Sequence, residues 1–265
     1  MRNIYFILLS MMVGCVGCEW QLNSDEDETD VVVERYDRVQ SLYLTTSDFS
    51  ALQHMNTIYP MQTRTLIEDV LHIGQVNDPQ INTRFLSFYQ DSTLQALISE
   101  AEHQYANMDD INEALSAAFK YLKKHLPDME IPEVYAQIGA LDQSVIVGNG
   151  MIGISLDKYL GAEYELYLKP EYGYSVEQRQ MMERRYIVPD CIVFYLLSLY
   201  PMADSLIGQS ERDIHMGRIL WVVNKAIGQK LFNNGYVQKV DKYMNQHRSM
   251  TVEQLLSSKD YSVFQ

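Results

Sequence analysis

The sequence is short of cysteine. Three cysteines occur in 265 residues, and two of them, Cys15 and Cys18, lie near the N-terminus. Residues 31–265 therefore hold one thiol, Cys191, inside the apolar run IVPDCIVFYLLSLYP, where a lone cysteine is normally a small core residue. This shortage excludes a scaffold stapled by disulfides within the chain, so the fold has to rest on its hydrophobic core.

Positive charge is also scarce. The chain has 21 Lys and Arg against 35 Asp and Glu, for a formal net charge of −14. Arg2 and the six acidic residues of segment 19–30 account for −5 of this, so residues 31–265 carry −9. An acidic body argues against nucleic acid as a partner and against peripheral adhesion to anionic lipid.

Motifs that carry chemistry are absent as well. No two of the six histidines are three, four or five residues apart, so the sequence has no HExxH-type zinc motif. P-loop, GxGxxG and GxSxG motifs are missing, and GNGMIG at 148–153 lies between predicted strands rather than before a helix. We therefore predict no metal, no cofactor and no identifiable catalytic residue. Paired carboxylates from distant parts of the chain stay possible, because sequence spacing does not reveal them.

An export signal is present at the N-terminus. Met1-Arg2-Asn3 is followed by an uncharged apolar run, Ile4–Gly14, which is too short to span a bilayer. Small or apolar residues precede both Cys15 and Cys18, so either thiol can be the lipidated residue of a lipoprotein. The alternatives are an ordinary cleaved signal and a redox CxxC pair, although such pairs normally open a helix inside a folded domain.

The next segment, EWQLNSDEDETD (19–30), contains six acidic and no basic residues. It cannot bury enough apolar surface to fold, so it reads as a disordered tether. It also resembles the surface-export signals of Bacteroidetes lipoproteins, with a plain solvated linker as the alternative. The predicted organisation is a signal peptide (1–17), an acidic tether (18–30) and a single globular domain (31–265). The lipid would attach that domain to a membrane.

The periodicity of the domain indicates an α+β fold that is mainly helical, with one small antiparallel sheet in the middle of the chain. A short strand is expected at 31–36, and three strands at 133–140, 144–148 and 151–156, the last two joined by the turn Asn149-Gly150. Helices are expected at 47–59, 61–74, 91–105, 108–127, 175–186, 188–200, 212–232, 235–247 and from Thr251.

The segment GAEYELYLKPEYGY (161–174) interrupts the helices with four tyrosines. It is either a binding loop with exposed aromatic anchors or a long loop packed down by its own rings.

Four sequence segments resemble those of one protein family. ISLDKYLG (154–161), RYIVPDCIVFYLL (185–197), GRILWVVNKAIG (217–228) and the tail VDKYMNQHRSMTVEQLL (240–256) are similar to the GldB-type gliding-motility lipoproteins of Bacteroidetes, in their shorter form. The resemblance implies a zinc-peptidase-like (zincin-like) fold in which a strand pair precedes the metal-binding helix. Here that helix would read DCIVF at 190–194, without the histidines and the glutamate. The implied protein is a degenerate peptidase scaffold with no catalytic residues to transfer.

These observations predict a non-enzymatic, lipid-anchored outer-membrane protein that binds another envelope, secretion or motility component. An exposed edge of strand 151–156 and the tyrosine loop are the expected contact surfaces. The residues concerned are Met151, Ile152, Ile154, Leu156, Tyr164, Tyr167, Tyr172 and Tyr174. The alternatives are an envelope hydrolase with scattered carboxylates, acting on peptide or glycan, and a purely structural subunit with a large apolar patch.

Overall fold

The structure is a computed structural model that describes residues 30–202 and 208–264. Val31–Gln265 form one compact unit, separate from Met1–Asp30. The predicted signal peptide, both N-terminal cysteines and all of the tether except Asp30 lie outside the described residues.

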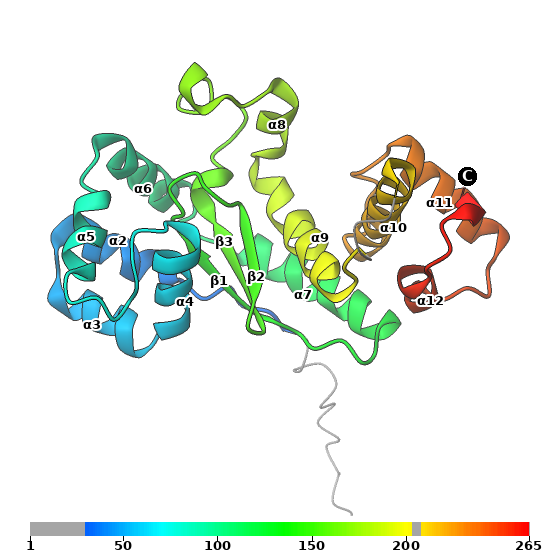
Figure 1. The fold of residues 1–265 in the computed structure, drawn as a ribbon, viewed down its shortest axis with the longest axis horizontal. Coiled ribbons are helices and arrows are strands. Elements are labelled where there is room, and N and C mark those ends of the chain that lie inside the picture. Colours follow the sequence, from blue (N-terminus) through cyan, green and yellow to red (C-terminus); the bar gives the residue numbers. More distant parts are fainter. Residues whose placement is uncertain (1–29, 203–207, 265) are drawn as a thin grey trace, which may run out of the picture. The chain divides into compact units, whose positions relative to one another are not determined.

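Helices make up most of the compact unit, as the sequence predicts (Figure 1). Before the sheet lie α2 (Tyr36–Thr46), α3 (Phe49–Thr57), α4 (Pro60–Arg64), α5 (Ile81–Phe88), α6 (Ser92–Gln104) and α7 (Asp109–His125). After it lie α8 (Val176–Met181), α9 (Ile187–Leu199), α10 (Gln209–Ala226), α11 (Gly235–Gln246) and α12 (Val252–Ser257). Several start where the capping residues predict, at Asp48, Asp91, Ser175 and Thr251.

The sheet has three strands, β1 (Glu133–Gln137), β2 (Val145–Gly148) and β3 (Met151–Ser155), in the order β1-β3-β2. The hairpin β2–β3 is antiparallel, as expected from Asn149-Gly150. Both turn residues have positive φ, 52° and 74°, which suits the tight turn of a two-residue hairpin. However, β1 pairs parallel to β3, so the sheet is mixed rather than wholly antiparallel.

Helices from both halves of the chain pack on this sheet. α9 contacts β2 and β3, whereas α2 contacts β1. α7 pairs with α9, α10 lies against both, and α11 and α12 pack on α10. Apolar side chains at helical spacing explain the position of α7, whose buried stripe is Ile111, Leu115, Ala118, Phe119 and Leu122.

Several local expectations differ from the structure, among them the ends of the helices expected at 175–186 and 212–232, which stop at Met181 and Ala226. The expected strand at 31–36 is only a bridge, in which Glu34 pairs parallel to Tyr135, and Tyr36 already begins α2. The helix expected over 61–74 becomes a π-helix at Thr65–Val70 and ends before His72, whose φ is 51°. α5 was not expected from the sequence.

Candidate functional site

Strand β3 is the centre of the sheet, so the expectation that strand 151–156 presents an exposed edge is wrong. β1 occupies one side of β3 and β2 occupies the other. Ile152 and Ile154 are fully buried, and so is Leu156, which follows the strand, while Met151 is 8% exposed. These side chains belong to the core. The sequence shows that three strands exist, but it does not show which of them lies in the middle.

The four tyrosines of the loop pack on each other. Tyr167 is buried, with its ring centroid 5.2 Å from that of Tyr164 and 5.9 Å from that of Tyr174, both edge to face. Tyr172 stacks on Tyr174 at 6.4 Å. Tyr164, Tyr172 and Tyr174 are half-buried. The loop is therefore packed down by its own rings, and Tyr167 is an internal residue rather than an exposed anchor.

The loop is tied to a buried carboxylate turn at the end of β3. Asp157 is fully buried and accepts hydrogen bonds from the backbone N–H groups of Gly139 (2.7 Å) and Leu141 (2.5 Å). Ala140 and Leu141 both have positive φ, 54° and 64°, which is costly for residues with a Cβ. Burial raises the pKa of Asp157, while its hydrogen bonds oppose that rise. The carboxylate thus holds a strained turn in place.

The neighbours of Asp157 complete this network. The Tyr167 hydroxyl donates to the Asp157 carbonyl oxygen (2.5 Å) and accepts from the Leu160 N–H (3.1 Å). The Lys158 ammonium donates to the Tyr174 hydroxyl at 3.0 Å and lies 4.7 Å from the centre of its ring. All of these groups have their partners inside the fold. The LDKYLG phrase therefore has a structural role in this turn.

A second carboxylate lies at the start of α9. The Tyr159 hydroxyl donates to Asp190 Oδ2 at 2.8 Å. Burial raises the pKa of Asp190 to about 7, and this hydrogen bond opposes the rise. Cys191 is fully buried, and burial raises the pKa of its thiol, so it is an inert core residue as the sequence indicates.

The free edge of the sheet belongs to β2. The outer side of β1 is covered by Glu34, which donates to the Val134 carbonyl (2.8 Å) and accepts from the Ala136 N–H (2.9 Å). On the hairpin, Ser155 N donates to Ser144 O at 3.0 Å, which makes that pair a hydrogen-bonded one.

Because hydrogen-bonded and non-hydrogen-bonded pairs alternate in an antiparallel ladder, Ile146 and Gly153 form the next hydrogen-bonded pair. Val145 and Val147 then direct their backbone N–H and C=O groups away from β3. Within residues 30–202 and 208–264, these groups have no hydrogen-bond partner. Unpaired backbone therefore remains at both residues, of which Val145 is buried and Val147 is partly exposed.

A cavity of about 230 Å³ lies beside this edge. The register aligns Tyr135, Gly153 and Ile146 across the three strands, on one face of the sheet. Gly153 is required there, because a Cβ would lie 2.6 Å from the Tyr135 ring. The lining residues are Thr65, Asp69, Tyr135, Ile146, Val147, Gly148, Asn149 and Met151.

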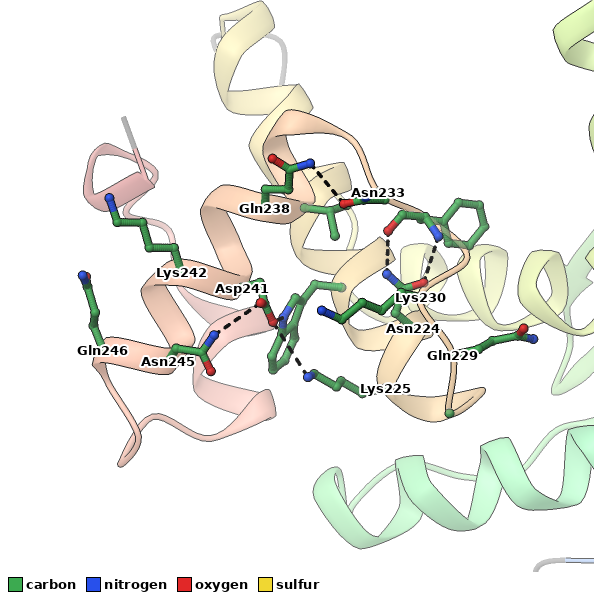
Figure 2. A pocket seen from close by; sticks show the side chains of 14 residues that line it. Asn224, Lys225, Gln229, Lys230, Asn233, Gln238, Asp241, Lys242, Asn245 and Gln246 are labelled. Atoms are coloured by element: carbon green, nitrogen blue, oxygen red, sulfur yellow. Dashed lines mark hydrogen bonds and ion pairs between the residues drawn. The ribbon is translucent and has the colours of Figure 1, made fainter.

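A larger cavity of about 730 Å³ lies between α10 and α11 (Figure 2). Its lining includes the pair Trp221 and Asp241, in which the indole Nε1 donates to Oδ1 at 2.8 Å. Six amide side chains and three lysines line it, namely Asn224, Gln229, Asn233, Gln238, Asn245, Gln246, Lys225, Lys230 and Lys242. Sequence reasoning missed this cavity, since the residues lie on two helices and a loop without a motif.

The described residues lack two further features, a metal site and a membrane-spanning helix. In residues 30–202 and 208–264, no three His, Cys, Asp or Glu side chains are grouped so that they could hold a metal ion. Over the same ranges, none of the helices combines the length and apolar character needed to cross a membrane.

Comparison with known proteins identifies the chain at the level of its family. A mainly helical α+β domain behind a lipoprotein-type N-terminal sequence defines the class. The family model described as "Gliding motility protein GldB" matches residues 17–231, and the chain belongs to this family of gliding-motility lipoproteins. Membership in a lipoprotein family indicates a membrane-anchored envelope protein. No curated protein and no solved structure matches the chain significantly.

The match leaves part of the chain outside it. It ends within the loop after α10, so α11 and α12 lie beyond the matched residues. The cavity between α10 and α11 therefore has one wall inside the matched region and one outside it.

Proposed function

We propose that this protein is a non-enzymatic lipoprotein of the outer membrane in a Bacteroidetes-type envelope, anchored through Cys15 or Cys18. Its domain binds an extended segment of another envelope, secretion or motility protein along strand β2. Family membership supports the anchor and the setting. The free edge of β2 supports the mode of binding.

The observation that carries the binding mode is the unpaired backbone of Val147, which is partly exposed, whereas Val145 is buried. An extended peptide can add to such an edge through main-chain hydrogen bonds, and pockets for alternate side chains supply specificity. The cavity beside Ile146 and Gly148 lies where a side chain of the added strand would enter. β3 cannot serve this purpose because it is flanked on both sides.

The non-enzymatic part of the proposal rests on the helix that follows the sheet. α9 contacts β2 and β3 and follows them in the chain, and the resemblance to zinc peptidases implies the metal-binding helix at this point of the sequence. It carries Asp190, Cys191 and Phe194 in the stretch where the resemblance implies HExxH. Such a helix has neither nitrogen ligands for zinc nor a glutamate to act as general base. We propose that it is a pseudo-peptidase scaffold that binds without cleaving.

The alternative, an envelope hydrolase with scattered carboxylates, requires two facing carboxyl groups about 5–10 Å apart. Asp69 lines the cavity beside β2, Asp110 lines one between α7 and α9, and Asp241 lines the cavity between α10 and α11. Each of these three cavities in the described residues has one lining carboxylate. This arrangement favours the binding protein over the hydrolase.

A photo-crosslinking amino acid at Gly148, an exposed residue at the end of β2, tests the proposal in intact cells. We expect it to capture an envelope protein. In the same background, Val147→Pro removes the outward N–H but leaves the β2–β3 ladder intact, since proline is tolerated at a sheet edge. The adduct should fall about tenfold or more with this variant, because the edge loses a main-chain donor.

Val147→Thr is the matched control, since it keeps the backbone donor and the branched Cβ. It should preserve the adduct, and both variants should keep the thermal unfolding midpoint of the parent. Equal capture by the proline and threonine variants, with both folded, would refute strand addition at β2.

A further inference from the structure

The cavity between α10 and α11 is a ligand site that the proposed edge of β2 does not use. Its volume of about 730 Å³ lies within the range of small-molecule sites, about 300–1,000 Å³. Unlike most such sites it is lined mainly by polar side chains. A ligand that fits it must therefore make many hydrogen bonds to side chains.

The amides on the walls retain free hydrogen-bonding atoms. The Gln238 amide donates to Asn233 Oδ1 at 3.1 Å, which leaves an acceptor on Gln238 and a donor on Asn233. Asn245 donates to Asp241 Oδ2 at 3.3 Å and keeps its carbonyl oxygen free. Gln229 lies on the opposite wall. Mixed donors and acceptors of this kind suit hydroxyl groups, which both donate and accept.

Asn224 has a different function, because its amide fixes the loop after α10 that forms part of the cavity lining. Its amide donates to the Phe232 carbonyl (2.7 Å) and accepts from the Phe232 N–H (3.0 Å). This two-way bond fixes the loop that carries Lys230 and Asn233. The loop is thus positioned by contacts within the protein, without a ligand.

The charge of the cavity is opposite to that of the protein. Three lysines face one carboxylate in a domain whose net charge is −9. Both oxygens of Asp241 already accept hydrogen bonds, from Trp221 and Asn245, and Lys225 lies 3.8 Å from Oδ1. In Figure 2 the side chains of Lys225 and Lys230 extend toward the middle of the cavity. Lys230 has no hydrogen-bond or ion-pair partner among the described residues, so a cationic group is left for a ligand.

The lining of the cavity also indicates which of two ligand classes, extended peptides or saccharides, it can bind. α10 and α11 are helices whose backbone groups are paired internally, so the walls present side chains rather than a main-chain edge. Extended peptides are normally held through main-chain edges, whereas sugar hydroxyls are held by side chains that both donate and accept hydrogen bonds. Trp221 is buried, and Lys225 lies 5.0 Å from the centre of its ring, so the indole is a fixed part of the lining that reports on the cavity.

We infer that this cavity binds an anionic saccharide, a sugar that carries a carboxylate or phosphate group. The exposed amides hold the sugar hydroxyls, and Lys230 holds the anionic group.

Tryptophan fluorescence gives a direct test. The chain has two tryptophans, Trp20 and Trp221, so Trp20→Phe in the full chain leaves Trp221 as the only reporter. The probes are galacturonic acid, its trimer and glucose 6-phosphate, with a neutral trisaccharide and a triglutamate peptide as comparisons. We expect a saturable change with at least one anionic sugar, and at least tenfold weaker binding of the neutral sugar and the peptide. Binding of the trimer alone would indicate a glycan chain, and equal binding of the monomer a free sugar acid.

Two variants locate the binding. Lys230→Gln should weaken it about tenfold, because one cationic partner is lost. Lys239→Gln, on the exposed part of α11 and outside the cavity lining, should leave it unchanged. The inference is overturned if no anionic sugar changes the fluorescence, if neutral and anionic sugars bind equally, if the peptide binds as well as the sugars, or if the two lysine variants behave alike. None of these outcomes bears on β2.

Discussion

The Tyr159 hydroxyl donates a 2.8 Å hydrogen bond to Asp190 Oδ2 and thereby joins the segment after β3 to the first turn of α9. Burial raises the pKa of Asp190 to about 7 despite this bond. The folded protein therefore holds a proton on Asp190 that the unfolded chain releases at much lower pH.

Asp190 makes the stability of the fold depend on pH. Its folded pKa lies above the unfolded value, so its contribution to the free energy of unfolding falls as pH rises from about 4 to about 7 and is constant above that range. Asp190→Asn stays neutral at every pH and keeps an oxygen for Tyr159. Relative to the wild type, it should gain up to about 4 kcal/mol between pH 4 and pH 8, at about 1.36 kcal/mol per pKa unit. Urea unfolding at both pH values measures this gain.

Tyr159→Phe checks the assignment of that effect. The hydroxyl lowers the pKa of Asp190, so its removal should shift the fall in stability to higher pH. If both variants follow the wild-type pH profile, the pKa of Asp190 is the same in the folded and unfolded states and the assignment is wrong.

Asp157→Asn should destabilise the fold through the strained turn. The carboxylate accepts from Gly139 and Leu141, whereas an asparagine has one acceptor oxygen and would leave one buried N–H unpaired. We expect the free energy of unfolding to fall by about 2–4 kcal/mol, because hydrogen bonds to a charged carboxylate are lost and a buried donor is left unsatisfied. Asp142→Asn, exposed in the same turn, should stay within about 0.5 kcal/mol. Equal urea midpoints for the two variants would contradict the role of Asp157.

The tyrosine loop contains a buried ring, Tyr167, and half-buried rings such as Tyr172, and the two kinds should differ in their effect on stability. Tyr167→Phe leaves the Leu160 N–H without its acceptor, so we expect a loss of about 1–3 kcal/mol in unfolding free energy. Tyr172→Phe removes a hydroxyl with no hydrogen-bond partner among the described residues and should change stability by less than about 0.5 kcal/mol. Thermal and urea unfolding distinguish the two. The reverse order of effects would show that the loop is not held through Tyr167.

Arg218 should fix the C-terminal segment. Its buried guanidinium donates to the carbonyls of Ser258 (2.7 Å) and Asp260 (2.6 Å) and lies 4.3 Å from the centre of the Tyr261 ring. Arg218→Lys cannot reach both carbonyls, because an ammonium is a single point of charge. Amides of residues 258–264 should then exchange faster with solvent and be cleaved sooner by protease. Unchanged exchange there, with the rest of the fold intact, would argue against this restraint.

Lipidation can be assigned by mass. Intact-mass spectrometry of the native membrane fraction should show a diacylated N-terminal cysteine in the wild type, and either Cys15→Ser or Cys18→Ser should abolish it. A mature chain without lipid would remove the proposed anchor.

The sequence predicts elements better than their arrangement. Capping residues and apolar periodicity place α6, α7 and the β2–β3 hairpin, since those signals are local. α2 is missed because its buried face includes polar residues such as Gln40, whose amide bonds the Ile138 backbone in both directions at 2.9 Å. A satisfied buried polar group breaks the apolar period from which a helix is predicted.

The candidate sites depend on pairing at long range, which the sequence does not encode locally. β3 lies between β1 and β2 because it pairs in parallel with β1. A parallel pair has no short turn between its strands, so no turn residues in the sequence predict it. For the same reason the sequence pattern predicts the free edge on β3, whereas the structure has it on β2. The pairing of Trp221 with Asp241 joins two helices across 20 positions, without a motif that would have revealed the cavity between them.

The covered side of β1 has a mechanical consequence. Glu34, four residues after the acidic segment ends, is joined to Val134 and Ala136 by two backbone hydrogen bonds. Tension applied along the N-terminal segment therefore reaches the central sheet directly through those two bonds. Val31 and Val33 are buried on the way, and their backbone N–H groups are held by Ser116 and Asn112 of α7. A domain pulled by its N-terminus would be loaded at its central sheet and at α7 rather than at a fraying end.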